Sequence, residues 1–280
     1  FCWRRSGSRT SLYSISRPQG AITISQKIHP TAIVDSSASL GNNVEVGAYS
    51  IIDADVKIGD GCRISNHVTL RSGVSFENDC TVFPGAVIGE IPQDLKFKGE
   101  DSKINIGSNV TVREYVTIHR ATSARGKTII GNSCYLMAYS HVAHDCVLGK
   151  EVTLVNGVHL GGCVDIEDYA FVSGNVVIHQ FTKIGRHAFI GGGYRVVQDV
   201  PPYIMAAKEP LTFTGVNLVG LKRAGFSNEV LRNLKEAYRL LYKSLLNVSQ
   251  ALDEIRKTLP DTEEIKNVIS FVKNSERGII

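Results

Sequence analysis

Apolar side chains recur at every sixth position through most of this chain. The series runs without a polar exception from Ile28 to Ile88, resumes in the same phase at Ile106, and after a second break continues from Ile130 to Val196. Two residues before each of these positions the side chain is usually small or β-branched, and Gly often follows. Because a helix requires a period of 3.6, this spacing predicts short strands joined by turns, the hexapeptide pattern of a parallel β-helix.

Three such strands close one triangular coil, so residues eighteen positions apart are expected to stack in one column, roughly 4.8 Å apart. Crossovers between parallel strands are nearly always right-handed. The repeat resembles that of the hexapeptide proteins, and this resemblance implies the left-handed exception. We therefore predict an all-β domain, a left-handed parallel β-helix, over residues 23–200.

Two stretches interrupt the repeat, and the chain beyond it has a different pattern. Residues 89–103 and 121–127 break the series but preserve its phase. This indicates loops extruded from corners of a continuous solenoid, where binding groups are often placed; for the second loop, surface decoration is an equally good interpretation. The pair Pro201-Pro202 then stops strand pairing. From Ser227 onward apolar residues recur at helical spacing, which predicts three helices in a small α-helical domain over residues 201–280.

The first 22 residues differ in composition from the rest. They contain Arg4, Arg5, Arg9 and Arg17, are rich in Ser and lack carboxylates, since Asp35 is the first acidic residue. This composition is typical of an organellar transit peptide, with the excess of Arg favouring mitochondria over plastids; a plain basic tail is the alternative. Without those four Arg, 27 basic and 27 acidic residues balance. The charge therefore gives no support for nucleic-acid binding, and no apolar run reaches the roughly 20 residues of a transmembrane segment.

The cysteines and histidines bear on metal binding. Four of the six Cys occupy the small inward position of the repeat: Cys62, Cys80, Cys134 and Cys146. Burial as small hydrophobes explains them, and no CxxC pair is present. The eight His make a zinc site an alternative to consider, because trimeric carbonic anhydrase-like hexapeptide proteins bind zinc with three His. Zinc ligands must converge on one point, whereas the spacing of His141 and His144 tends to place them on different faces. We predict no metal and no cofactor.

One column combines groups suited to acyl transfer. His144, Gly162 and Gln180 are separated by eighteen residues each, so they are expected on successive coils, flanked by Cys163 and His179. A His one coil from a Gly supplies a base for a hydroxyl proton and a closely approachable backbone N–H for an oxyanion. A lone His in a turn is more often a satisfied polar residue. The acid that follows this His, and the Gly opposite it, favour the chemical interpretation.

Seven segments occur in order along the chain: Gly89–Lys96, Thr117–Arg120, His141–Cys146, His179–Phe181, Gln198–Tyr203, Gly215–Asn217 and Gly220–Arg223. Together they resemble the bacterial UDP-N-acetylglucosamine O-acyltransferase family, which catalyses the first step of lipid A biosynthesis. The resemblance extends from about residue 28 to the end of the chain. With a transit-like leader in front, the chain is similar to the plant organellar form of that enzyme.

The resemblance implies transfer of an (R)-3-hydroxyacyl group from acyl carrier protein to the 3-hydroxyl of UDP-N-acetylglucosamine, by a homotrimer with active sites between subunits. It implies that His144 is the general base, that Asp145 orients its ring and that the Gly162 N–H stabilises the oxyanion. Gly192 matches the position that limits acyl length in the family, and its lack of a side chain implies a preference for about fourteen carbons; a strained corner is the alternative explanation of this Gly. The residues implied to hold the nucleotide sugar are Asp94, Lys96, His119, His179, Gln180, Asn217 and Arg223.

The chain departs from the family pattern at three places. Cys163 stands where the bacterial pattern has a His, and Val219 and Ala224 replace a Glu and an Arg near the nucleotide. These changes imply altered or weaker binding of the nucleotide, while the chemistry at His144 is retained. Two alternatives stay open: the related family that N-acylates UDP-3-O-acylglucosamine, and a carbonic anhydrase-like mitochondrial trimer without acyltransferase activity. The Gln93–Lys96 loop and the helical ending favour the O-acyltransferase.

Overall fold

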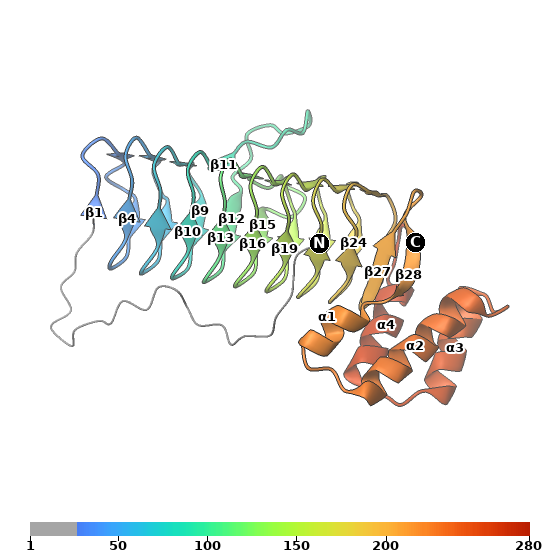
Figure 1. The fold of residues 1–280 in the computed structure, drawn as a ribbon. Coiled ribbons are helices and arrows are strands. Elements are labelled where there is room, and N and C mark those ends of the chain that lie inside the picture. Colours follow the sequence, from blue (N-terminus) through green and yellow to red (C-terminus); the bar gives the residue numbers. More distant parts are fainter. Residues whose placement is uncertain (1–26) are drawn as a thin grey trace.

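A long triangular β-helix followed by a group of helices makes up the computed structural model, which describes residues 27–280 (Figure 1). The leader predicted over residues 1–22 lies outside the described residues. Each coil contributes one short strand to each of three sheets, here called A, B and C, and neighbouring coils pair in parallel. The hexapeptide prediction of a parallel β-helix is confirmed.

The strands are two to five residues long, and most have only two. Sheet A contains β1 (Lys27–Ile28), β4 (Glu45–Val46), β7 (Arg63–Ile64), β10 (Thr81–Val82), β13 (Thr111–Val112), β16 (Tyr135–Leu136), β19 (Thr153–Leu154), β22 (Phe171–Val172), β25 (Phe189–Ile190), β27 (Ile204–Ala207) and β28 (Thr212–Val216). Sheet B contains β2 (Ile33–Val34), β5 (Ile51–Ile52), β8 (Thr69–Leu70), β11 (Val87–Glu90), β14 (Thr117–His119), β17 (His141–Val142), β20 (His159–Leu160), β23 (Val177–Ile178) and β26 (Arg195–Val196). Sheet C contains β3 (Ser39–Leu40), β6 (Lys57–Ile58), β9 (Val74–Phe76), β12 (Lys103–Ile106), β15 (Lys127–Ile130), β18 (Val147–Leu148), β21 (Asp165–Ile166) and β24 (Lys183–Ile184).

The apolar residue at each sixth position points into the solenoid. From Val46 to Val196 every member of the series is at most 4% exposed, and each such side chain contributes about 1.5–3 kcal/mol by leaving water. Ile28 is 40% exposed, because among residues 27–280 it lies on the first coil and no other coil covers it from outside. The six-residue repeat therefore builds one continuous core along the axis.

The sheets meet at three edges, named AB, BC and CA after the sheets that they join. Many turns at these edges contain a non-Gly residue in the left-handed region, such as Tyr139 on AB (φ 63°), Asp145 on BC (φ 61°) and His187 on CA (φ 54°). Both interruptions of the repeat, residues 91–102 between β11 and β12 and residues 120–126 between β14 and β15, leave from the BC edge. Figure 1 shows the first of them projecting from the solenoid beyond β11.

Neither insertion disturbs the register of the coils. Val82 pairs with Val112 across the first insertion, and Val112 pairs with Leu136 across the second. Both insertions are thus loops outside a continuous ladder, as the preserved phase predicts.

Sheet A continues beyond the predicted end of the β-helix. Strand β27 pairs in parallel with β25 and in antiparallel with β28, so the region predicted to be helical from residue 201 begins with a hairpin. The pair Pro201-Pro202 ends sheets B and C, while the chain re-enters sheet A at Ile204. The six-residue period is lost in this hairpin, which is why the repeat did not reveal it.

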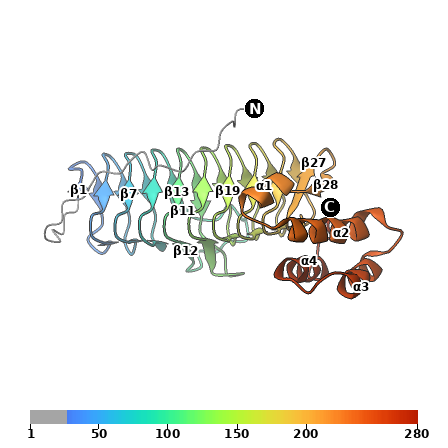
Figure 2. The ribbon, with the colours of Figure 1, turned by 60° about the horizontal axis from the view of Figure 1, so that its bottom comes forward.

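Four helices follow the hairpin: α1 (Leu218–Arg223), α2 (Asn228–Lys243), α3 (Val248–Thr258) and α4 (Glu263–Lys273). The predicted three correspond to α2, α3 and α4, and Ser227 caps α2 by accepting a hydrogen bond from the Val230 N–H at 3.2 Å. Figures 1 and 2 show α2, α3 and α4 grouped beyond the last coils, with α1 beside the solenoid. Within residues 27–280, no helix combines the length and hydrophobicity needed to span a bilayer.

Candidate active site

His144 lies in the turn between β17 and β18, on the BC edge. Its Nδ1 is 2.8 Å from Oδ2 of Asp145, the next residue in the chain. The His144 side chain is 17% exposed, and the Asp145 side chain is fully buried. The His144 ring is therefore accessible to solvent, whereas the Asp145 carboxylate that it contacts is not. The His–Asp pair expected from the sequence is formed within this single chain.

The second insertion holds the Asp145 carboxylate in place. Thr122 donates to Oδ2 twice, through its backbone N–H at 3.1 Å and its hydroxyl at 2.7 Å, and the Arg125 N–H donates to Oδ1 at 3.1 Å. The Asp145 N–H in turn donates to Thr128 Oγ1 at 3.0 Å. A buried carboxylate surrounded by donors is an acceptor, so the His144 Nδ1–H is the donor in the pair.

The second insertion thus supports the site and is more than surface decoration. Thr122 of this insertion and Thr128 of β15 are buried, and both fix Asp145. Sequence reasoning missed Thr122, Arg125 and Thr128 as supporting residues. The available signal was that the insertion precedes β15, which lies next to β18 in sheet C and so places the loop beside the His144 turn.

Gly162 lies one coil beyond His144 and directly beneath its ring. A Cβ on Gly162 would lie 2.3 Å from Cε1 and 2.4 Å from Nε2 of His144, so a side chain here would force the ring to move. Backbone hydrogen bonds fix this stacking, with the Cys163 N–H donating to the His144 carbonyl and the Phe181 N–H to the Gly162 carbonyl, both at 3.0 Å. Within residues 27–280 the Gly162 N–H has no hydrogen-bond acceptor. A free N–H beside an imidazole edge is the arrangement that an oxyanion requires.

Three further predicted residues lie on or beside the same edge. His179 and Gln180 are exposed, one coil beyond Gly162, and His179 Nδ1 lies 3.0 Å from the Gln180 carbonyl oxygen. Asp94 belongs to the first insertion, where its Oδ1 accepts the Lys96 N–H at 2.9 Å. Burial raises the pKa of the Cys163 thiol, and the charge of Asp94 is a minor cause in the same direction. The Lys96 side chain is exposed to solvent.

Histidines form a row along sheet B beside His144. The His119 and His141 rings meet edge to face at 4.9 Å between centroids, and those of His141 and His159 at 6.4 Å. Burial lowers the pKa of His119, and burial with the neighbouring imidazoles lowers the pKa of His141 to about 4. Both rings are therefore neutral near neutral pH, and they can bind a substrate by hydrogen bonds but not by charge. The sequence argument selected His119 and gave His141 and His159 no separate role.

The remaining predicted residues lie on other edges. Asn217 caps α1 by accepting the Gly220 N–H at 3.1 Å, and its Nδ2 donates to the His187 carbonyl on the CA edge at 3.0 Å. Arg223, in the last turn of α1, is exposed. Gly192 lies in the turn between β25 and β26, on the AB edge. One chain therefore does not bring Asn217, Arg223 or Gly192 together with His144.

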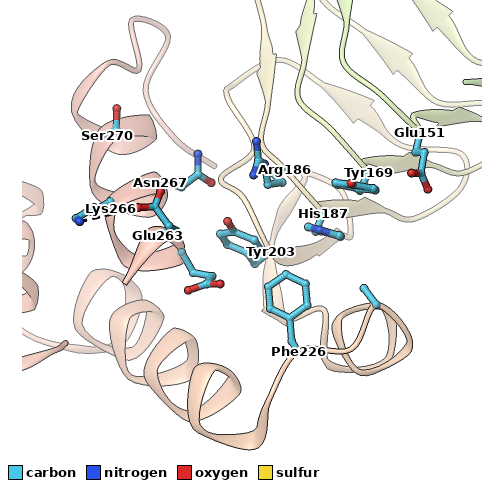
Figure 3. A pocket seen from close by; sticks show the side chains of 12 residues that line it. Glu151, Tyr169, Arg186, His187, Tyr203, Phe226, Glu263, Lys266, Asn267 and Ser270 are labelled. Carbon is cyan, nitrogen blue, oxygen red and sulfur yellow. Dashed lines mark ion pairs between the residues drawn. The ribbon is translucent and has the colours of Figure 1, made fainter. Parts of the chain in front are cut away.

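A pocket of about 750 Å³ opens on the CA edge next to α1 and α4. Figure 3 shows aromatic rings along its solenoid side and polar groups from α4 across from them. Burial lowers the pKa of His187 to about 4 and raises that of Tyr203, so both rings are neutral near neutral pH. Ala224, one of the three departures noted in the sequence, lines this pocket.

Two family models match the chain. One, described as Bacterial transferase hexapeptide (six repeats), matches residues 37–72 and 127–162, a stretch that includes His144 and Gly162. The other, described as Udp N-acetylglucosamine O-acyltransferase, Domain 2, matches residues 199–280, which contain the hairpin and the helices. Fold and site together thus define a transferase of the hexapeptide-repeat class.

Similar proteins identify the family within this class of transferases. The Acyl-[acyl-carrier-protein]--UDP-N-acetylglucosamine O-acyltransferase of Thermodesulfovibrio yellowstonii is 47% identical over 254 residues, covering 90% of this chain and 98% of that protein. The solved UDP-N-acetylglucosamine acyltransferase of Bacteroides fragilis 9343 is 45% identical with a TM-score of 0.88, covering 90% of this chain and 99% of that one. The Arabidopsis enzyme of that name is 32% identical with a TM-score of 0.78, again covering 90% and 99%. This chain belongs to the UDP-N-acetylglucosamine O-acyltransferase family, and its β-helix is the left-handed one expected.

The contact between Gly162 and His144 gives a structural prediction. We expect a crystal structure of Gly162→Ala to show the His144 ring displaced by about 1 Å, because the added methyl lies 2.3 Å from Cε1 and ordinary contact begins at 3.4 Å. Gly174→Ala is the control, since its methyl has 3.3 Å to the nearest atom and lies on the AB edge. An unmoved ring in Gly162→Ala would contradict the proposed need for Gly at this place.

Proposed function

We propose that this chain transfers an (R)-3-hydroxyacyl group from acyl carrier protein to the 3-hydroxyl of UDP-N-acetylglucosamine, the first step of lipid A biosynthesis. Membership of the family supports the reaction and both substrates. The observation that carries the mechanism is the His144–Asp145 pair held against the free N–H of Gly162.

His144 is the general base in this proposal. Because its Nδ1–H donates to Asp145, Nε2 keeps its lone pair and can take the proton of the sugar hydroxyl as the new carbon–oxygen bond forms. Asp145 stabilises the imidazolium that results. Negative charge develops on the thioester oxygen, where the Gly162 N–H donates a hydrogen bond. Collapse of the tetrahedral intermediate expels the carrier thiolate, which takes the proton from His144.

The nucleotide sugar is held in this proposal by residues of the BC edge, the adjoining strand β14, the first insertion and α1. Asp94, His179 and Gln180 offer hydrogen bonds, and His119 does so as a neutral ring because burial lowers its pKa. Lys96 and Arg223 provide the cationic groups that a diphosphate requires. At three positions the family pattern has a polar or charged side chain that this chain lacks, namely at Cys163, Val219 and Ala224. The affinity for the nucleotide is therefore expected to be lower than with the family residues.

A homotrimer explains why the predicted residues lie on different edges. His144 is on BC, whereas Asn217 contacts the CA edge and Arg223 is at the end of the same helix. In a three-fold ring, the BC edge of one subunit can face the CA edge of the next, so that one site takes residues from two chains. Sharing of this kind would join the two halves that a single chain keeps apart.

The acyl chain is proposed to run from His144 toward Gly192 along the outer face of sheet B. From β17 to β26 the sheet advances by three coils, which is about 14 Å at the spacing of paired strands. Val177 lies on this path and is 50% exposed. A Gly at the far end leaves room for the acyl terminus, consistent with a preference for about fourteen carbons.

The two alternative activities have less support. The family model that matches residues 199–280 is that of the O-acyltransferase, which favours the hydroxyl over the amino acceptor. A carbonic anhydrase-like reaction needs three converging His, whereas the His119, His141 and His159 rings form an extended row.

We expect His144→Ala to lower turnover by about 10²–10⁴ or more, the contribution of a positioned base. Steady-state assays with 3-hydroxyacyl carrier protein and UDP-N-acetylglucosamine measure this, with His179→Ala as the matched exposed His on the same edge. His179→Ala, and likewise His119→Ala, should chiefly raise KM. Near-normal turnover in His144→Ala, or activity that vanishes on chelation and returns with zinc, would contradict base catalysis.

Mixed trimers test the shared site. Neither His144→Ala nor Arg223→Ala trimers should be fully active, but a one-to-one mixture reassembled from both should regain about a quarter of the wild-type sites, because His144 and Arg223 then come from different chains. Activity equal to the mean of the two unmixed variants would show that each chain uses its own Arg223.

Gly192→Met should shift the preference to shorter acyl donors by filling the end of the groove. Competition between donors of different chain length measures the profile. An identical profile in Gly192→Met would remove this residue from chain-length selection.

Import into mitochondria, rather than plastids, is proposed from the Arg- and Ser-rich, acid-free composition of residues 1–22. A fluorescent reporter fused to this segment should accumulate in mitochondria. A reporter that stays in the cytosol would contradict the proposal.

A further inference from the structure

Three different metal-ligating groups meet beside Gly162. His144, Asp145 and Cys163 each offer a ligand atom, and these atoms all lie within 4.8 Å of one another. The first two come from one coil and Cys163 from the next, so the stacking of the coils creates the cluster. Cys163, which flanks the His144 column, is also one of the three positions at which the chain departs from the family pattern.

The hydrogen bonds of the cluster decide which atoms remain available. Asp145 already accepts from Thr122, Arg125 and His144, so it orients the ring. This leaves Nε2 of His144 and Sγ of Cys163 as open ligands. A His whose other ring nitrogen donates to a carboxylate is the usual form of a metal-binding His, because the carboxylate fixes the ring and raises its basicity.

Cys163 differs from the other described cysteines. The thiols of Cys62, Cys80, Cys134 and Cys146 each donate to a backbone carbonyl inside the solenoid. Within residues 27–280 the Cys163 sulfur has no such bond, and the residue occupies a left-handed turn at the BC edge (φ 61°). Burial raises the pKa of this thiol, which makes it a poor nucleophile and disfavours covalent modification. A metal ion can still bind by displacing the thiol proton.

We propose that His144 Nε2 and Cys163 Sγ bind a thiophilic divalent cation such as Zn²⁺, with water in the remaining positions, and that this ion inhibits the protein. Imidazole and thiolate are the ligand types that Zn²⁺ prefers. The bound ion occupies the lone pair with which His144 takes a proton and blocks the Gly162 N–H. The ion is a reversible inhibitor and has no part in acyl transfer. Binding is argued from the clustering of His144, Asp145 and Cys163 and from the hydrogen bonds that occupy Nδ1 and the carboxylate, whereas inhibition rests on the proposed function.

Cobalt provides a test of binding that does not depend on activity. Co²⁺ added to the full chain should give a thiolate-to-cobalt charge-transfer band that saturates at one ion per subunit. The band should be lost in Cys163→Ser and Cys163→Ala and kept in Cys146→Ser. Ser is suited to that inward position, because Ser50 occupies it elsewhere and donates to the Ser65 carbonyl at 2.7 Å. No band in the wild-type chain, or a band that persists in both Cys163 variants, would overturn the proposal.

Zinc inhibition is then measured within each variant, as activity with Zn²⁺ relative to activity without it. The concentration of Zn²⁺ that halves turnover should rise at least about tenfold in Cys163→Ser, as expected when a metal-site contact is removed, and stay unchanged in Cys146→Ser. Equal sensitivity of the two variants would overturn the inhibitory role even where cobalt binds. A wild-type chain that binds cobalt but shows no turnover under any condition would instead contradict the proposed function.

Discussion

Stacking of successive coils is the interaction on which the rest of this structure depends. Each turn donates backbone hydrogen bonds to the turn before it, as Cys163 does to His144 and Phe181 does to Gly162. These bonds, with the buried residue at every sixth position, fix which residues lie above one another. The column that contains the candidate base is therefore set by the register of the whole solenoid. A slip of one residue would turn the apolar series outward and dismantle the site together with the core.

On this rigid support, the chemistry depends on a buried carboxylate. The Asp145 carboxylate is buried, and burying it would cost free energy if no hydrogen-bond donors faced it. Thr122 and Arg125 of the second insertion supply these donors. The insertion thus stabilises a charge that the regular repeat cannot accommodate. Its second effect is to direct the Nδ1–H of His144 and leave Nε2 facing the Gly162 column. Stability and reactivity at this edge come from the same hydrogen bonds.

Much of this could be predicted from the sequence because the solenoid is periodic. The strands, the inward residues and the column of His144 with Gly162 follow from counting in sixes. The hairpin of β27 and β28 could not be predicted that way, since it leaves the period and pairs in antiparallel. Donors such as Thr122 were missed because they reach Asp145 from a loop whose path no repeat determines. Asn217 and Arg223 were assigned by resemblance alone, and their place away from the BC edge becomes visible only in three dimensions.

The central claim is that Asp145 holds His144 as the tautomer with Nδ1 protonated and Nε2 free. Nitrogen-15 NMR of histidine-labelled protein, with His144 assigned by comparison with His144→Ala, reports directly which nitrogen carries the proton. The account predicts a protonated Nδ1 and an unprotonated Nε2 for the neutral ring, with this preference lost in Asp145→Ala. A neutral His144 protonated on Nε2 in the wild-type protein would contradict it, because that ring could not accept the substrate proton at the position facing Gly162.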